Sequence, residues 1–165
     1  MEKYAFRPYH TVYAKRFSVE KRCLRILLGN GVAIEHVGST AVPGLGGKGI
    51  LDIVIGVPRK EMKKIKKKLE GGGYEFRQQA STPQRFFFRK NGRDTDITKR
   101  VHLHLVSLHG KEWGDMILFR GYLRTHKKAV QAYSMLKRQA AKKAKGEGEV
   151  YRRYKEGFIR NILKS

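Results

Sequence analysis

The chain has 165 residues, 40% of them hydrophobic, which is enough for one globular domain with its own core over residues 1–165. Thirty-seven lysines and arginines against 14 acids give a formal net charge of +23, which indicates a polyanionic partner, with RNA as the leading candidate. A membrane span and an internal disulfide are excluded, because no apolar run is long enough and Cys23 is the one cysteine, so we expect a cytoplasmic protein without a membrane partner.

Helix and strand signals alternate along the first half of the chain. Tyr9–Leu28 has apolar residues at helical spacing, which predicts an amphipathic helix that buries the thiol of Cys23. Val32–Val37 and Ile50–Val57 have the composition of two strands. Arg59–Glu70 holds seven bases and two acids, and its apolar spacing predicts a helix with a strongly cationic outer face.

The second half begins with strand signals and ends in helices. Arg85–Lys90 precedes Asn91-Gly92, the strongest two-residue hairpin signal, so we expect the return strand over Arg93–Val106. The other expected elements are a short strand, a polar loop and three helices, at Tyr74–Arg77, Gln78–Gln84, Trp113–Thr125, Lys128–Lys145 and Val150–Leu163. This order predicts an α+β fold, a mixed β-sheet flanked by helices, with an α/β core in residues 1–110 and a helical part in residues 111–165.

A Gly-Ser turn at Gly38 and Ser39 separates the first two strands, and a lone aspartate, Asp52, lies inside the second strand. This arrangement is typical of polymerase-like nucleotidyltransferases, in which the turn approaches a triphosphate and carboxylates on the next strand hold the metal. An unpaired carboxylate in an apolar strand is costly, so Asp52 must meet a metal, a cation or backbone donors. Val54 stands where a second acid would be expected, so the pattern predicts the fold more strongly than the chemistry.

Gly38, Ser39, Thr40 and Lys48 are the candidate phosphate-binding residues of this turn and of the glycine-rich connection after it. Free amides at the start of a helical turn bind phosphate, and a lysine in a flexible connection reaches it. The alternative is a tight turn capped by Ser39 or Thr40 beside a mobile surface lysine. The connection is not a Walker P-loop, because Gly49 follows the lysine.

These motifs resemble those of the GrpB family, small proteins with a nucleotidyltransferase-type fold. IEHVGST, VPGL, Lys48 and ILDI match its signature nearly in order, and further matches follow at HLH (102–104), FRGYLR (119–124), LKR (136–138) and KEGFI (155–159). Gly49, Gly121 and Lys127 depart from the family pattern, which has proline, aspartate and proline at these places. The resemblance covers nearly the whole chain and implies the nucleotidyltransferase-type fold.

The return strand is expected to collect polar groups on one face, because side chains alternate along a strand. That face would carry Asp94, Asp96, Thr98, Arg100, His102 and His104. If the strand lies beside Ile50–Val57, the two histidines meet Asp52 and the three side chains form a candidate site for Mg²⁺ or Mn²⁺. The alternative is that both histidines are polar positions on a half-exposed sheet.

The C-terminal helices supply further candidate cations. Arg120 and Arg124 share a helix face at i, i+4, and Lys137 and Lys155 fall at positions that match the family, so all four are expected to bind phosphate. From residue 120 to residue 164 there are 14 bases and 3 acids. The expected nucleic-acid surface combines bases from this region and from the basic helix: Lys63, Lys64, Lys67, Lys142, Lys143, Arg152 and Arg153.

Two functions are compatible with these residues. The first is a metal-dependent nucleotidyltransferase that moves an NMP group from an NTP to an RNA or protein acceptor, with Asp52, His104 and Arg100 in catalytic roles. The second is a non-catalytic nucleotide- or RNA-binding module that keeps the fold and has lost the second metal carboxylate. The basic surface fits both functions and does not choose between them.

Overall fold

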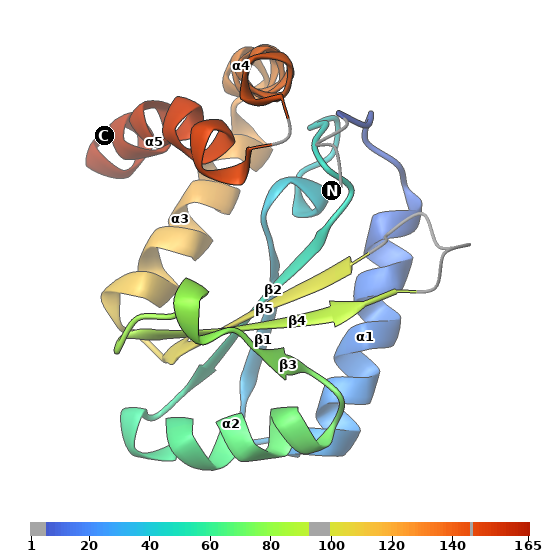
Figure 1. The fold of residues 1–165 in the computed structure, drawn as a ribbon, viewed down its shortest axis with the longest axis vertical. Helices are drawn as coiled ribbons and strands as arrows, with labels where there is room; N and C mark the ends of the chain where they lie inside the picture. The colour runs from blue at the N-terminus through green and yellow to red at the C-terminus, as the bar shows by residue number, and fades with distance from the viewer. Residues whose placement is uncertain (1–5, 93–99, 146) are drawn as a thin grey trace.

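The computed structural model describes residues 6–92, 100–145 and 147–165 (Figure 1). Its centre is a five-stranded sheet in the order β1-β2-β5-β4-β3. The strands are β1 (Ala33–Val37), β2 (Leu51–Val57), β3 (Glu75–Phe76), β4 (Arg85–Asn91) and β5 (Arg100–Ser107). The helices are α1 (Val12–Leu28), α2 (Met62–Gly71), α3 (Lys111–Thr125), α4 (Lys127–Ala144) and α5 (Gly148–Lys164), with short 3₁₀ turns at Ser39–Ala41, Arg59–Glu61 and Gln78–Ala80.

Strand pairing places the second and fifth strands side by side at the centre of the sheet. β2 and β5 are parallel, whereas β1 pairs with β2, and β4 pairs with β5 and β3, in antiparallel fashion. In the parallel pair, Asp52 lies opposite His102 and Val54 lies opposite His104. The mixed sheet therefore brings the polar face of β5 next to the acid of β2, as the sequence predicted.

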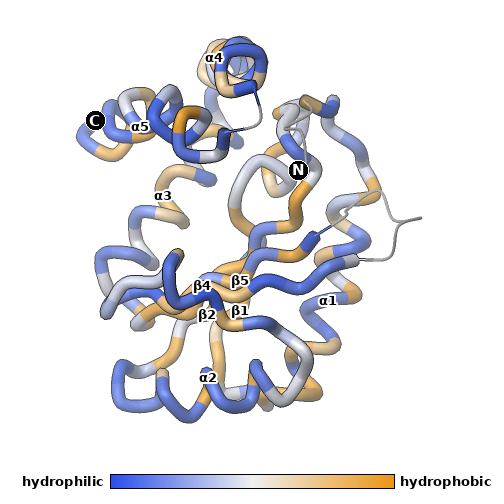
Figure 2. Tube along the Cα trace, in the orientation of Figure 1, coloured by the Kyte–Doolittle hydropathy of each residue, from blue (hydrophilic) through white to orange (hydrophobic). Residues whose placement is uncertain are grey.

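The two faces of the sheet are covered differently. α1 and α2 pack on one face, where Leu24 and Leu69 join Ile53, Phe88 and Leu103 in the main core. In Figure 2 orange gathers around the middle of the sheet, while α2 shows both blue and orange segments, as expected for an amphipathic basic helix. The opposite face is covered in part by α3.

The helices of residues 111–165 also pack on the loop between β1 and β2. Leu123, Tyr133 and Ile162 form a cluster with Val42 and Leu45 of that loop. α4 and α5 lie at the end of the molecule away from α2 (Figure 1). The loop that contains the Gly-Ser turn is therefore enclosed between the sheet and the helical part.

Most predicted elements are present within a few residues of their expected ends, but the hairpin prediction is wrong. Asn91 pairs with Arg100, whereas a two-residue turn at Asn91-Gly92 would pair Lys90 with Arg93. Asn91 is thus part of the strand pairing and is not the first residue of a two-residue turn, so the pairing in the sheet overrides the local Asn-Gly preference. Residues 93–99 lie outside the described residues, and with them the candidates Asp94, Asp96 and Thr98.

The predicted burial of Cys23 is also wrong, because its side chain is exposed. Tyr13, Leu24 and Leu28 define the buried side of α1, and Cys23 lies one step of about 100° around the helix from Leu24. No helix in the described part of the chain is both long and apolar enough to cross a bilayer.

Candidate functional site: a lysine-lined cavity at Asp52

The Gly-Ser turn lies directly against the acid of β2. Gly38 follows β1 with φ +75°, a conformation that favours glycine, and Ser39 begins the short 3₁₀ turn after it. A β-carbon built on Gly38 would lie 2.6 Å from Asp52 Oδ2. Because no larger residue fits there, the backbone of the turn and the carboxylate of Asp52 form adjoining walls of one site.

The carboxylate of Asp52 meets both histidines of β5. His104 Nε2 lies 3.4 Å from Asp52 Oδ1, and His102 Nδ1 lies 3.7 Å from the same oxygen. The Asp52 side chain is 25% exposed. Burial is the largest single influence and raises its pKa, but the hydrogen bond from His104 and the charges of His102, His104 and Lys155 together outweigh burial. The pKa is therefore lowered, and the group is ionised at neutral pH. Burial lowers the pKa of His102 to about 4, so this imidazole is neutral at pH 7.

Asp52 opens into a cavity of about 190 Å³ between the sheet, the Gly-Ser loop and the helical part. The cavity is lined on the sheet side by Gly38, Ser39, Lys48, Ile50, Asp52 and His102, and on the helix side by Phe119, Tyr133, Lys137, Tyr151 and Lys155. The sequence candidates Gly38, Ser39, Lys48, Asp52, His102, Lys137 and Lys155 are thus brought together from distant parts of the chain.

The wall of this cavity holds three lysines and one carboxylate. Lys137 is 4% exposed, and its Nζ donates a hydrogen bond to the carbonyl of Gly46 at 3.0 Å. Burial, helped by the charge of Lys155, lowers the pKa of Lys137 to about 7, and the same two causes lower the pKa of Lys48 to about 8. Burial also lowers the pKa of Lys155. Burial and the repulsion between the three ammonium groups both disfavour their charged forms. A bound anion would favour the charged form of each lysine, so the cavity favours an anionic ligand.

Two tyrosines hold these lysines in place. The Nζ atoms of Lys48 and Lys155 lie 4.4 Å and 4.5 Å from the centre of the Tyr151 ring. Lys137 Nζ lies 5.2 Å from the centre of the Tyr133 ring. Cation–π contacts of this kind orient an ammonium group without neutralising it. The ring faces therefore fix where the three ammonium charges lie around the cavity.

The residues at this site do not fit a two-metal centre. Such a centre needs several carboxylates that share the ions, and Asp52 is the one acid among the cavity residues. The place of the second acid is filled by Val54, which is fully buried and packs in a cluster with Trp113, Met116 and Ile117 of α3. Among the described residues, no group of three or more His, Cys, Asp and Glu side chains is arranged to hold a metal ion.

Three other candidate residues lie close to the cavity and do not line it. His104 faces Asp52 from β5, and Arg100, at the start of β5, is near enough for its charge to contribute to the lowered pKa values of Lys48 and His102. Arg120 Nη1 donates hydrogen bonds to Glu35 Oε2 at 2.7 Å and to the His36 carbonyl at 2.9 Å. This pair of bonds fastens α3 to β1.

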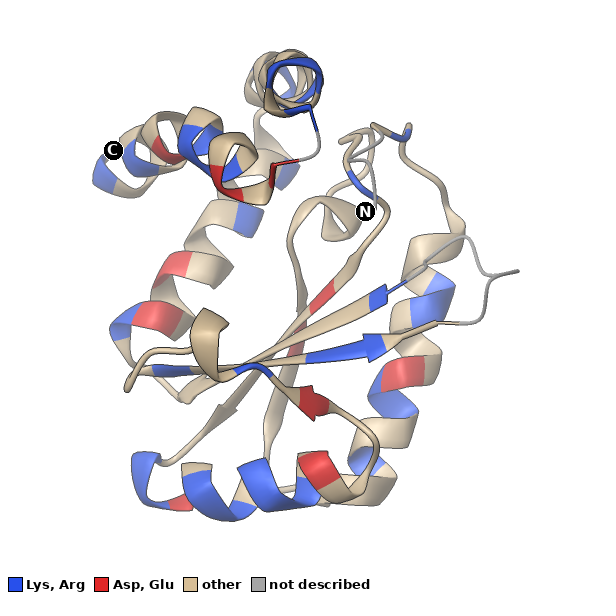
Figure 3. Cartoon of the chain, viewed as in Figure 1, with Lys and Arg blue, Asp and Glu red and all other residues tan. Residues whose placement is uncertain are grey.

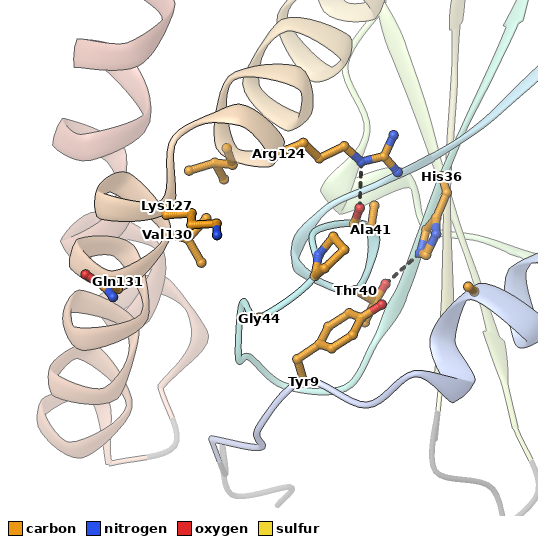
Figure 4. A pocket seen from close by; sticks show the side chains of 12 residues that line it. Tyr9, His36, Thr40, Ala41, Gly44, Arg124, Lys127, Val130 and Gln131 are labelled. Atoms are coloured by element: carbon orange, nitrogen blue, oxygen red, sulfur yellow. Dashed lines mark hydrogen bonds between the residues drawn. The ribbon is translucent and has the colours of Figure 1, made fainter.

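Arg124 and Thr40 belong to a second cavity, of about 680 Å³, on the other side of the Gly-Ser loop (Figure 4). Arg124 Nε donates to the Ala41 carbonyl at 2.9 Å, and Thr40 Oγ1 is hydrogen-bonded to His36 Nε2 at 2.8 Å. His36 is buried, which lowers its pKa to about 4, so it is a neutral partner of Thr40. Arg124 and Thr40 therefore make hydrogen bonds that fix the Gly-Ser loop to α3 and to β1.

The bases expected to form a nucleic-acid surface are all exposed, but they lie at two ends of the molecule. Lys63, Lys64 and Lys67 are on α2, and the others are on α4 and α5, at the opposite end (Figure 3). Lys142, Lys143, Arg152 and Arg153 make up this second group. The two groups therefore do not form one continuous face.

Tyr133 and Tyr151, the aromatic wall of the cavity, are not among the site residues expected from the sequence. Tyr133 also packs between helices, because its ring stacks on that of Phe158 at 4.8 Å between ring centres. A usable signal is present in the repeated Tyr-x-x-x-Lys spacing, which gives Tyr133 and Lys137, and Tyr151 and Lys155. Residues at i, i+4 share a helix face, so each tyrosine accompanies its lysine into the cavity.

Comparison with known proteins identifies relatives over almost the whole chain. The sequence model of a family described as GrpB protein matches residues 4–165. A UPF0157 protein of Pseudomonas aeruginosa is 33% identical over 158 residues, which cover 94% of this chain and 64% of the relative, so the chain spans less than two thirds of that protein. The glutamate-rich protein GrpB of Alkalihalophilus pseudofirmus is 30% identical over 154 residues, 92% of this chain and 88% of the relative.

Solved structures with the same fold include conserved protein GrpB from Enterococcus faecalis, with a TM-score of 0.82, 27% identity, and coverage of 97% of this chain and 95% of that one. They also include the Cid1 poly(U) polymerase with MgGTP bound, with a TM-score of 0.54, 11% identity, and coverage of 82% of this chain and 44% of that one. At this identity the second likeness concerns the fold alone. The predicted nucleotidyltransferase-type fold is confirmed.

Proposed function

Because the chain belongs to the GrpB family, we propose that it is a nucleotide-binding module that holds the phosphates of its ligand in the lysine-lined cavity. The observation that carries this proposal is the convergence of Lys48, Lys137 and Lys155 on the cavity that the Gly-Ser turn also lines. This charge pattern favours a bound phosphate. The Cid1 poly(U) polymerase, which has a similar fold, has been solved with MgGTP bound.

The size of the cavity suits the phosphate part of a nucleotide. Whole small-molecule sites typically have volumes of about 300–1,000 Å³, whereas this cavity has about 190 Å³. In the proposed complex the phosphate oxygens accept hydrogen bonds from the three ammonium groups and from the amides at the start of the turn. The sugar and base then lie outside the cavity.

Metal-dependent transfer of an NMP group to an RNA or protein acceptor is the second candidate function. It is favoured by the meeting of Asp52 with His102 and His104 on a nucleotidyltransferase-type fold. One carboxylate supplies too few ligands for two-metal transfer, and Val54 is packed under α3. Nucleotide binding without metal-dependent transfer therefore fits the residues of the site better.

Each labelled NTP is incubated with the protein and total RNA in Mg²⁺, in Mn²⁺ and in EDTA, beside an Asp52→Asn variant. Asp115→Asn is the matched control, because Asp115 is an aspartate on α3 that pairs with Lys111 away from the cavity. We expect NTP binding that persists in EDTA and becomes several-fold tighter in Asp52→Asn, because a negative charge is removed beside the phosphates. Transfer of label to RNA or protein that disappears in Asp52→Asn would establish the second function instead.

A further inference from the structure

β4 presents three side chains on the face of the sheet that carries Asp52. These side chains are Arg85, Phe87 and Arg89, and the side chain of the buried Phe88 points to the other face. Their partners on β5 are, in the same order, Val106, His104 and His102. Phe86 and Phe88 belong to the main core on the other face, but Phe87 is part of none of the hydrophobic clusters found among the described residues. Phe87 is therefore an aromatic residue without a core to pack in.

The ring of Phe87 lies beside the two imidazoles of the site. Its centre is 4.9 Å from that of His102, at an interplanar angle of 75°, and 5.3 Å from that of His104, at 58°. The contacts to His102 and His104 use the edges and inclined faces of the rings, and the Phe87 side chain keeps partial exposure to solvent. A planar ligand group can thus reach this aromatic platform.

Two arginines flank the platform, and their hydrogen-bonding capacity is not filled by the protein. The Nε atoms of Arg85 and Arg89 are buried and have no hydrogen-bond partner in the described part of the chain. Arg89 Nη2 donates to Glu75 Oε2 at 3.1 Å, and Arg77 shares the same carboxylate. No side-chain ion pair of Arg85 is found among the described residues. The buried Nε groups are not accessible to a ligand. The donors that remain for acceptors from outside are therefore those on the Nη atoms, which arginine carries in addition to Nε.

We propose that this strip, Arg85, Phe87 and Arg89, binds single-stranded RNA, with a base stacked on Phe87 and phosphates paired with the arginines. Sheet faces that display an aromatic residue between cations recognise unpaired bases in this way, whereas the bases of a duplex are not available for stacking. Alternate residues of a strand are about 7 Å apart, so Arg85 and Arg89 span about 13 Å.

The strip is separate from the lysine-lined cavity, and an RNA strand bound to it would lie near that cavity. β4 and β2 are separated by β5 alone, which corresponds to about 10 Å. An RNA strand on Phe87 therefore runs beside the site at Asp52, whereas the basic helix α2 packs on the other face of the sheet. The inference goes beyond the proposed nucleotide binding, because it assigns RNA to a different surface.

The test measures the binding of a fluorescently labelled ten-nucleotide RNA of mixed sequence, by anisotropy, at several salt concentrations. We expect Phe87→Leu to weaken binding about tenfold without changing the salt dependence, since a stacking contact is lost and no charge is removed. Phe87→Tyr should retain the affinity. In a plot of log K against log salt concentration, Arg85→Gln should make the negative slope shallower by about 0.7, as expected for the loss of one phosphate contact. Lys63→Gln on α2 is the matched control and should change the affinity less than Arg85→Gln.

The proposal is overturned if Phe87→Leu binds the RNA as tightly as the wild-type protein, or if Lys63→Gln weakens binding as much as Arg85→Gln. The proposal is also overturned if duplex RNA binds as tightly as the single-stranded RNA, or if a polyglutamate peptide competes as well as unlabelled single-stranded RNA. Both results would indicate a purely electrostatic surface. Tripolyphosphate binding is measured with the same variants and should be unchanged in Phe87→Leu. If tripolyphosphate does not bind to any form of the protein while the RNA result holds, nucleotide binding fails and the RNA site stands.

Discussion

Gly38 lies so close to the carboxylate of Asp52 that no side chain fits between them. A β-carbon on Gly38 would lie 2.6 Å from Asp52 Oδ2 and 2.9 Å from Asp52 Cβ, closer than real side-chain atoms approach. The positive φ of Gly38, +75°, adds a second reason for glycine at this position. The turn after β1 and the acid on β2 are thus fixed relative to each other before any ligand binds.

Replacement of this glycine should damage the fold and the site together. We expect Gly38→Ala to lower the free energy of unfolding by about 1–3 kcal/mol, because the new methyl group is strained by its backbone angle and collides with Asp52. Gly31→Ala is the control, since a β-carbon there meets nothing within 4 Å, and its effect should stay within about 0.5 kcal/mol. Urea denaturation of both variants gives the comparison. Equal stabilities would contradict the close approach of Gly38 to Asp52.

The buried ammonium group of Lys137 should lower the stability of the fold and strengthen the binding of an anion. Burial of an ammonium group is unfavourable, so Lys137→Met should raise the free energy of unfolding at pH 7 by about 1–3 kcal/mol while anion binding weakens. Lys143→Met, at an exposed position of the same helix, should leave both quantities nearly unchanged. Chemical denaturation and calorimetric titration measure the two effects. A less stable Lys137→Met variant would indicate that the ammonium group is a structural donor to Gly46.

The same lysine should give a characteristic pH dependence of stability. Its pKa is about 7 in the folded chain and its ordinary value is 10.5, so between these values the unfolded chain binds more protons. The penalty of burying Lys137 is therefore absent above pH 10.5, grows as the pH falls towards 7, and is complete below that. The stability gain of Lys137→Met over the wild-type protein should be larger at pH 7 than at pH 10. A gain that does not change with pH would show that this lysine keeps its ordinary pKa.

Restoring the second acid should not restore a metal site. Val54 is fully buried against Trp113, Met116 and Ile117, so Val54→Asp places an unpaired carboxylate in an apolar cluster. We expect a loss of about 3 kcal/mol or more, compared with about 2 kcal/mol for the control Val54→Ala, and no gain in Mn²⁺ affinity. Thermal unfolding and Mn²⁺ titration measure both. A stable Val54→Asp variant that binds Mn²⁺ would show that this position still belongs to a metal centre.

Arg120 should behave as a structural residue. Its guanidinium group bonds the side chain of Glu35 and the carbonyl of His36, and a lysine ammonium does not reproduce this fork. Arg120→Lys should lower the free energy of unfolding by about 1–2 kcal/mol and leave tripolyphosphate affinity unchanged. Arg153→Lys, in an exposed pair with Glu149, should cost less than about 0.5 kcal/mol. Loss of anion affinity at full stability would return Arg120 to the phosphate-binding residues.

The sheet part of the site could be predicted from local rules. Alternation along a strand places His102 and His104 on one face, and the cost of an unpaired acid requires that Asp52 meet polar partners. The parallel pairing of β2 and β5 confirms that these groups face each other. The helical part is different, because Lys137 and Lys155 were identified by the resemblance alone, and their depth in the cavity depends on how α4 and α5 pack.

The failures of prediction also have physical causes. The Asn-Gly signal describes a local preference, and the pairing of Asn91 with Arg100 depends on the whole sheet. Periodicity places Cys23 near the buried stripe of α1, but it does not resolve a residue at the edge of that stripe. The partners of Arg120 come from β1, about 85 residues earlier in the chain, and no sequence pattern connects the two segments.

The central claim, that the cavity at Asp52 binds phosphate through its lysines, is tested most directly by calorimetric titration of the protein with inorganic tripolyphosphate in EDTA at pH 6.5. We predict saturable binding with one site, at least tenfold weaker in Lys137→Met and unchanged in Lys143→Met. Absence of saturable binding, or equal affinity in the wild-type protein and in Lys137→Met, would contradict the claim.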